Sequence, residues 1–321
     1  MYDVTALGEL LIDFAARSAD GAGYPTMAAN PGGAPCNLLA ALSAYGCRTA
    51  FLGKVGDDVF GRLLVNTLRE AGIETSGVVL DAGVFTTLAF VTFSAGGERS
   101  FSFARKPGAD TQLRFDELDL ALIDGCRDFH FGTLSLTDEP ARTATQKAVA
   151  RAKGQGKWIS FDPNLRTPLW QSPAQAREAM LWGLAQADIV KISDEETSFL
   201  WGDVSPEDAA RRLHEAGAAA AFVTLGARGC YYSLRGDGGF VAAPAGIRPV
   251  DTTGAGDIFG GSALSRLLKT GLPLVGLTLA DVQAAARFAC CAASLSTQAP
   301  GGMSSVPAEG DVLALAARTH Q

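Results

Sequence analysis

Basic residues are scarce in this sequence, and their scarcity excludes two kinds of partner. The 321-residue chain carries 27 Lys and Arg against 34 Asp and Glu, which gives a formal net charge of −7. A nucleic acid or an anionic membrane would need a basic face for its phosphates, so we expect neither as a partner. An anionic ligand must instead be held by local groups such as a helix N-terminus, backbone amides, a few Arg or Lys, or a metal ion.

Cysteine and histidine are also scarce, and long apolar runs are absent. The six cysteines lack Cys-x-x-Cys spacing, and Cys290-Cys291 lies in an Ala-rich helical stretch, so we expect buried thiols rather than disulfides or a zinc site. No apolar run reaches the length that spans a bilayer. The first residues, Met1 to Gly8, lack the basic start of a signal peptide and predict a strand. We therefore expect a soluble, cytoplasmic protein.

The apolar residues, which make up 47% of the sequence, occur in short runs separated by stretches with helical spacing. Such runs are typical of strands buried on both faces. The predicted strands are Thr49–Gly53, Asp128–Gly132, Trp158–Phe161, Ile189–Ile192 and Ala221–Leu225. The predicted helices are Asn37–Tyr45, Phe60–Ala71, Glu139–Gln155, Pro173–Ala185 and Pro206–Ala216, several of which end at Gly. This alternation predicts a parallel sheet with helices on both faces.

Two segments depart from this alternation. Residues 14–31 are small, polar and glycine-containing, whereas Thr87–Phe93 and Ser100–Ala104 alternate around a Gly-Gly turn, which indicates a hairpin. We expect both segments, about 14–31 and 87–105, to form a small β lobe outside the main sheet. No linker or internal repeat divides the chain, so residues 1–321 are predicted to form a single domain.

Polar loops follow three of the predicted strands. They are Asp162-Pro163-Asn164-Leu165-Arg166, Ser193-Asp194-Glu195-Glu196 and Gly226-Ala227-Arg228-Gly229. In open α/β sheets, ligands bind beyond the carboxyl ends of the strands. We therefore expect these loops to converge on one cleft.

The strongest local signal is the segment Asp251-Thr252-Thr253-Gly254-Ala255-Gly256-Asp257, which precedes a helical pattern over Ser262–Thr270. Two glycines around a small residue let the backbone turn sharply and direct successive N–H groups at an anion, and the helix adds its positive dipole end. Asp257 could cap the helix or accept a proton from an attacking hydroxyl. Its glycine neighbours favour the catalytic reading. The segment matches neither a P-loop nor the GxGxxG of a dinucleotide site.

A second glycine pair occurs in Asn30-Pro31-Gly32-Gly33-Ala34-Pro35-Cys36-Asn37, and Gly53-Lys54-Val55-Gly56-Asp57-Asp58-Val59-Phe60-Gly61 follows it. With the later turn, and in this order, these segments resemble the ribokinase-like family of carbohydrate kinases, also called the PfkB family. The resemblance runs from Leu7 to Pro307. It implies a three-layer ribokinase-like α/β fold with a mostly parallel central sheet flanked by helices, a small β-sheet lid, and phosphorylation of a sugar primary hydroxyl by ATP with Mg²⁺.

The same resemblance implies a role for each site residue. Asp257 is the expected base, and the turn of Gly254, Ala255 and Gly256 is the expected anion hole. The expected sugar ligands are Asp13, Gly32, Gly33, Asn37, Arg105 and Arg166. The expected nucleotide-binding residues are Lys191, Thr224, Gly226, Arg228 and Gly229.

Two metal sites are also implied. Relatives organise magnesium with an Asn-x-x-Glu segment, but here Ser193 replaces the Asn, and Glu196 is retained for a contact through water. A monovalent cation, potassium, is implied beside the anion hole, held by Asp251, Thr253 and Ser305. Glu196 could otherwise be a charge at a helix start, and Asp251 could cap its own turn.

The identity of the sugar is less closely specified. The runs around Phe101–Asp110, Gly132–Leu136 and Asp162–Arg166 are most similar to the fructokinases of the family, which implies phosphorylation of D-fructose to fructose 6-phosphate. A 2-keto-3-deoxygluconate kinase is the alternative, because a carboxylate substrate would also use Arg residues. A catalytically silent sugar sensor and a nucleotide-binding oxidoreductase remain as alternatives from other classes.

The small lobe also predicts an assembly. Leu88, Phe90, Phe101 and Phe103 are expected to project from it, and its two faces cannot then both be polar. We therefore expect a homodimer that buries one of these faces.

Overall fold

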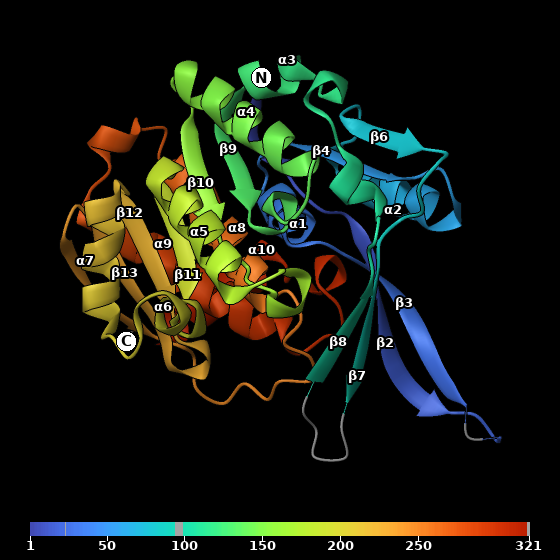
Figure 1. Cartoon of the computed structure of the whole chain (residues 1–321). Coiled ribbons are helices and arrows are strands. Elements are labelled where there is room, and N and C mark those ends of the chain that lie inside the picture. The colour runs from blue at the N-terminus through green and yellow to red at the C-terminus, as the bar shows by residue number, and fades with distance from the viewer. Residues whose placement is uncertain (23, 94–98, 320–321) are drawn as a thin grey trace.

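The computed structural model describes residues 1–22, 24–93 and 99–319, and its largest element is one twisted sheet (Figure 1). The strands run in the order β14-β13-β12-β11-β10-β9-β1-β4-β5, with β6 beside β4. Their bounds are β1 Tyr2–Leu7, β4 Thr49–Gly56, β5 Ile73–Glu74, β6 Val78–Asp81, β9 Cys126–Gly132, β10 Trp158–Asp162, β11 Ile189–Ser193, β12 Ala220–Thr224, β13 Gly229–Leu234 and β14 Asp237–Ala242. Strands β12 to β6 pair in parallel, and the β13–β14 edge is antiparallel.

Helices cover both faces of this sheet because alternate side chains of each strand face opposite ways. One core lies against α1 Ala34–Ala44, α2 Val59–Glu70, α8 Ala255–Lys269 and α9 Leu279–Ser296. The other lies against α3 Leu120–Asp124, α4 Ala141–Gly154, α5 Pro173–Gln186, α6 Asp194–Trp201 and α7 Pro206–Ala216. Helix α10, Glu309–Thr319, packs on α9. The predicted three-layer ribokinase-like fold is confirmed.

The five internal strands and five helices predicted from the sequence are all present, with ends shifted by a few residues. The largest difference lies at α8. Its predicted start was Ser262, whereas the helix begins at Ala255, so that Asp257 lies in the first turn. Helical spacing is hard to see there because Gly256, Gly260 and Gly261 face close neighbours rather than adding to an apolar pattern. Within the described ranges no helix is both long and apolar enough to cross a membrane.

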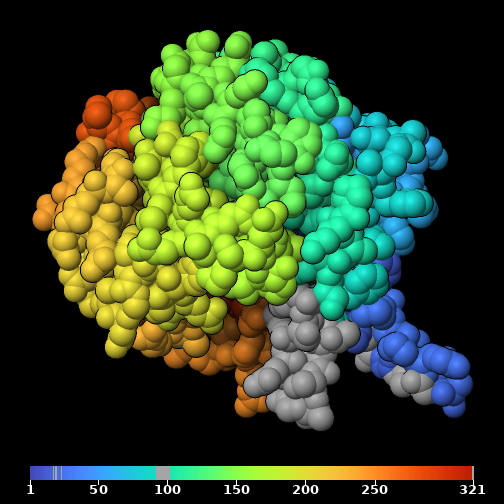
Figure 2. Space-filling view, in the orientation of Figure 1, coloured from blue at the N-terminus to red at the C-terminus, as the bar shows by residue number. Residues whose placement is uncertain are grey.

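A second, four-stranded sheet stands away from the main body (Figure 1). It is built from β2 Leu11–Ala19, β3 Pro25–Gly32, β7 Leu88–Phe93 and β8 Arg99–Ala104, in the order β3-β2-β7-β8. The predicted hairpin and the predicted small lobe are thus confirmed, although the hairpin turn at residues 94–98 lies outside the described residues. Figure 2 shows the β2–β3 part of this sheet projecting from the body.

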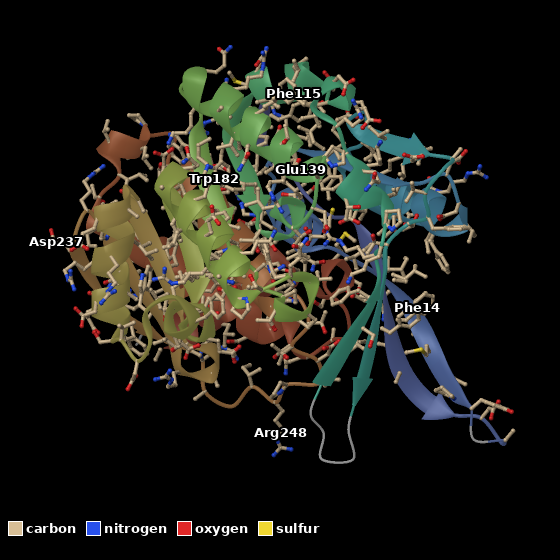
Figure 3. The ribbon with its side chains drawn as sticks, in the orientation of Figure 1. Phe14, Phe115, Glu139, Trp182, Asp237 and Arg248 are labelled. Atoms are coloured by element: carbon tan, nitrogen blue, oxygen red, sulfur yellow. The ribbon has the colours of Figure 1, made fainter. Side chains whose placement is uncertain are left out.

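The outer face of the small sheet carries aromatic rings. Phe14 of β2 stacks on Phe90 of β7 with 5.4 Å between ring centroids, and its edge meets Phe60 of α2 at 5.6 Å. Phe14 lies where the strands leave the body (Figure 3). The predicted projection of Phe101 concerns a side chain outside the described ones. Phe103 is on the other face, which points into a cleft.

Candidate active site

A cleft of about 440 Å³ opens between the small sheet and the carboxyl ends of the main strands. The small sheet contributes Leu11, Asp13 and Ala15, and the loops after β10 and β11 contribute Asn164, Arg166, Ser193 and Glu196. The start of α8 and the turn 300–302 complete the lining. Two of the three predicted loops therefore converge here. The third, Gly226–Gly229, does not line this cleft.

Asp257 lies at the floor of the cleft, in the first turn of α8. The helix is preceded by Gly254, whose φ of 74° is left-handed, and a Cβ there would lie 2.8 Å from the Cα of Gly302. Only glycine suits that position. Asn37 of α1 donates from Nδ2 to Asp257 Oδ2 at 2.8 Å and so fixes the carboxylate.

The amide groups beside Asp257 are suited to an anion. The first N–H groups of a helix have no intrahelical partner. Ala255 N–H donates to the Thr252 carbonyl at 3.3 Å, whereas the amides of Gly256 and Asp257 have no hydrogen-bond partner in the described part of the chain. With the helix dipole behind them, these amides can receive a phosphoryl group next to a carboxylate.

Burial, with a smaller contribution from the nearby Asp162 carboxylate, raises the pKa of Asp257 to about 7. The hydrogen bond from Asn37 and the charges of Lys191 and Arg166 act in the opposite direction. A carboxylate with a pKa close to the working pH can accept a proton in the reaction and return it to solvent afterwards.

We expect this pKa to appear in the pH dependence of the reaction. A base must be ionised to act, and a raised pKa leaves Asp257 protonated below about pH 7. With Mg-ATP saturating, kcat/KM for the sugar should therefore fall about tenfold per pH unit below that value, because this parameter reports the free enzyme's base. Activity that stays level down to pH 5 would contradict the assignment.

An ion pair lies beside the anion site. Lys191 of β11 donates from Nζ to Asp162 Oδ2 at 3.0 Å, and both side chains are largely buried. Although burial opposes it, the charges of Asp162, Glu196 and Asp257 raise the pKa of Lys191, which stays cationic. A Cβ on Gly256 would come within 2.9 Å of Nζ. Lys191, a predicted nucleotide ligand, thus lies against the turn that is predicted to bind phosphate.

The predicted sugar ligands Asp13, Gly33, Asn37 and Arg166 line the cleft, and Gly32 ends β3 beside them. The carboxylate of Asp13 accepts no hydrogen bond from any described residue, although burial raises its pKa to about 6 and the Arg166 charge lowers it. A Cβ on Gly32 would overlap Asp13 Oδ2, so Gly32 leaves room for that carboxylate. A partly buried carboxylate without protein donors is suited to ligand hydroxyls.

Arg105 is placed differently from the prediction. It is 5% exposed and lies outside the cleft lining, and its guanidinium donates to Asp110 Oδ2, the Leu134 carbonyl and Thr137 Oγ1, each at 2.8 Å. These contacts hold the end of β8 against the main domain. Thr87, directly before β7, also donates a hydrogen bond to Asp110. The guanidinium of Arg105 is therefore held by protein groups and the residue lies outside the cleft lining, which does not favour the predicted sugar contact.

The predicted nucleotide loop surrounds the short helix Gly226–Arg228 at the end of β12. Arg228 is exposed and pairs with Asp194 at 2.7 Å, and Thr224 Oγ1 donates to the Ile192 carbonyl at 3.4 Å. Gly226 and Gly229 have φ values of 56° and 113°, which make the turn possible. Thr224 pairs in register with Ser193, a residue that lines the cleft, but the loop itself lies outside the lining.

The predicted metal-binding residues have organised surroundings. Glu196 Oε2 accepts from Ser193 N–H and Oγ, and Oε1 accepts from Leu165 N–H, all within 2.9 Å. This capping box leaves lone pairs for water but fits indirect contact with magnesium better than direct ligation. In the described ranges, no three His, Cys, Asp or Glu side chains form a metal-binding group.

The potassium prediction concerns two loops that Asp251 joins. Its Oδ1 accepts from Thr253 N–H at 2.9 Å and Oγ1 at 2.7 Å, and its Oδ2 accepts from Gly301 N–H at 3.0 Å. Ser305 Oγ donates to the Gly302 carbonyl at 2.9 Å. Asp251 therefore does more than cap its own turn. It links the segment before Gly254 to the turn at Gly301, and the backbone carbonyl oxygens of such loops are ligands of the kind that a monovalent cation needs.

Glu9 is a cleft residue for which the sequence predicted no role. It is 2% exposed, accepts from Ala34 N–H at the start of α1 at 2.9 Å, and burial raises its pKa to about 7. The Gly8-Glu9 pair directly after β1 was the available signal, since the carboxyl end of a strand is a ligand-binding position.

The three-layer fold, the carboxylate at the start of α8 and the neighbouring amides, which have no partner among the described residues, are the features expected of a ribokinase-like kinase. The chain belongs to the pfkB family of carbohydrate kinases, since the model of that family, "pfkB family carbohydrate kinase", matches residues 1–309. Fructokinase-1 of Zea mays is 42% identical over 315 residues, which cover 97% of both chains.

Solved structures agree with this membership. Fructokinase with bound ATP from Xylella fastidiosa superposes with a TM-score of 0.91 at 29% identity, over 100% of both chains. A double mutant of fructokinase from Vibrio cholerae O395, in a form with fructose, ADP and potassium ion bound, gives a TM-score of 0.85 at 31% identity over 98% of both chains. The chain is therefore a carbohydrate kinase.

Proposed function

We propose that this protein transfers the γ-phosphoryl group of ATP to the primary hydroxyl of D-fructose and forms fructose 6-phosphate. The observation that carries the proposal is Asp257, which lines the cleft, accepts a hydrogen bond from Asn37 and lies next to helix-start amides that have no partner in the described part of the chain. The similarity to fructokinases over nearly the whole chain supports fructose as the sugar.

In this reaction, each residue of the cleft has a separate role. Asp13 and Arg166 hold the sugar hydroxyls, and Asp257 accepts the proton as the hydroxyl oxygen bonds to phosphorus and the bond to the ADP oxygen breaks. The amides of Gly256 and Asp257 and the Lys191 ammonium stabilise the charge on the transferred group. Magnesium, organised through Glu196 and water, would neutralise the charge of the ATP phosphates. The small sheet is the lid that excludes water.

A sugar panel tests the substrate assignment. The purified protein is assayed for ATP turnover with fructose, glucose, ribose and 2-keto-3-deoxygluconate, and the product is examined by phosphorus NMR. Fructose should give the highest kcat/KM, with phosphate on its primary hydroxyl. A higher value for 2-keto-3-deoxygluconate would replace the proposed substrate, and no turnover with any sugar would support a silent sensor instead.

We also propose a potassium ion in the loops joined by Asp251, where it would order the phosphate-binding turn. Replacing sodium by potassium at constant ionic strength should raise turnover, and Asp251→Ala should abolish the rise because it separates Thr253 from Gly301. Asp20→Ala, in the exposed β2–β3 turn, is the matched control and should keep the potassium response. Equal wild-type rates in both salts would exclude the ion.

We propose a homodimer formed through the outer face of the lid. Next to the Phe14, Phe60 and Phe90 cluster, Val59 and Phe85 are 73% and 80% exposed, which a second copy would cover. Sedimentation equilibrium should give a mass approaching twice 33.3 kDa as concentration rises. Phe85→Asp should shift the equilibrium to monomer. A wild-type monomer at every concentration would contradict the proposal.

A further inference from the structure

A row of buried polar side chains lies on the sheet face below the active site and takes no part in the mechanism above. Asp128 and His130 of β9 and Ser160 of β10 are 0%, 3% and 4% exposed, among the apolar residues that pack against α1 and α8. Phe129, Phe131 and Phe161 face the other way into the second core. Buried polar groups are costly unless they are hydrogen-bonded, so this row calls for a physical reason.

Hydrogen bonds in the row orient the imidazole ring of His130. Ser160 Oγ donates to Asp128 Oδ2 at 2.6 Å, so its oxygen is left to accept from His130 Nδ1, which lies 3.0 Å away. Burial raises the pKa of Asp128 to about 8, so above that pH, where Asp128 is ionised, the proton of the neutral ring is on Nδ1 and Nε2 is a bare acceptor. Burial and the Lys191 charge lower the pKa of His130 to about 3, which keeps the ring neutral.

The acceptor Nε2 has no hydrogen-bond partner among the residues that the structure describes, but the ring borders a cavity of about 20 Å³. Asp162 and Lys191 line the same cavity, and Ser160 and Leu38 help to close it. By this measure the space fits one water molecule, and three of the residues that line it, His130, Asp162 and Lys191, carry polar groups able to bond a water. A water there can donate to Nε2 and Asp162 and accept from Lys191.

We propose that His130 is a positioning residue for phosphoryl transfer, and that it holds the Asp162–Lys191 ion pair in place through one water molecule in this cavity. The pair determines the charge beside Asp257 and the place of the Lys191 ammonium against Gly256. His130 contacts neither substrate. The expected kinetic effect rests on the proposed kinase function. The tautomer of His130 and the position of the water do not depend on that function.

The tautomer is measured by long-range proton–nitrogen NMR at pH 9, where Asp128, whose pKa burial raises to about 8, is ionised. The chain has only three histidines, so the spectrum of His130→Gln identifies the His130 signals. We expect a neutral ring protonated on Nδ1, and a high-resolution crystal structure with a water between Nε2 and the ion pair. A ring protonated on Nε2, or a cavity filled by a side chain, would overturn the proposal.

Kinetic measurements at pH 9, where Asp128 is ionised, separate positioning from packing. His130→Leu removes the acceptor and should lower kcat roughly 10-fold, the usual scale for a residue that orients another, with KM values for sugar and ATP little changed. His130→Gln can return an acceptor oxygen to the water and should recover most of kcat. Phe131→Leu, which faces the other core, is the packing control and should lower the melting temperature while keeping kcat.

The outcomes distinguish this inference from the proposed function. Wild-type kcat in His130→Leu, or equal losses in the Leu and Gln variants, would refute positioning by His130. If the wild-type protein phosphorylates no sugar, the proposed function fails, whereas the NMR and crystallographic results still decide whether His130 holds the water.

Discussion

Asp257→Asn should lower kcat by roughly 10²–10⁴-fold, the usual effect of losing a general base, while ATP binding and folding are retained. Asparagine has the shape of aspartate and can still lie beside Asn37, but its amide cannot accept the proton of the sugar hydroxyl. Steady-state turnover at saturating fructose and ATP measures the loss, and calorimetric titration with an ATP analogue measures nucleotide binding.

Asp281→Asn is a matched control for this variant. Asp281 occupies in α9 the same third helical position that Asp257 occupies in α8, but there it only completes a capping box with Thr278. The Asp281→Asn variant thus removes an acidic residue from a helix start and leaves the cleft unchanged. If both variants keep wild-type turnover, Asp257 is a cap and not the base.

Asp13→Ala should lower kcat/KM for fructose by roughly 10²–10⁴-fold, because a hydrogen bond to a charged acceptor contributes about 1.5–3 kcal/mol and Asp13 can accept two. Its carboxylate accepts no hydrogen bond from the described residues, so substitution leaves no protein donor unpaired, and stability should change little. Competition titrations and initial rates at several fructose concentrations measure the loss.

The effect should be confined to the sugar. KM for ATP should stay close to the wild-type value, because Asp13 lies on the small sheet and the phosphate-binding turn lies on α8. Asp20→Ala, at the far end of the same sheet, should leave both substrates unaffected. An unchanged kcat/KM for fructose in Asp13→Ala would remove this residue from the sugar site.

The features that could be predicted from the sequence are those that depend on residues close together in the chain. Apolar periodicity predicts the parallel core and the small sheet. The turn around Gly254 could be predicted as an anion site because one turn and one helix start, formed by neighbouring residues, are enough to make such a site. Edge strands β13 and β14 were not predicted. The run Asp237-Gly238-Gly239 of β14 lacks strand-forming side chains, and pairing with β13 compensates for this.

Contacts between distant segments could not be predicted in this way. Asn37 and Asp257 are 220 positions apart, and nothing near Asn37 indicates that it holds the base rather than a sugar. The family resemblance placed Arg105 at the sugar, whereas in the structure Asp110 and Thr137 accept hydrogen bonds from its guanidinium. The ion pair of Asp162 and Lys191 likewise forms only when β10 and β11 lie side by side.

The burial of the cysteines has a practical consequence for observing lid motion. All six thiols are free and buried, and burial raises the pKa of each, so they react slowly with alkylating dyes. Tyr24, at the tip of the small sheet, is 70% exposed. A cysteine introduced there can carry a fluorophore without removal of the native thiols, and its emission then tests whether the small sheet moves when sugar is added.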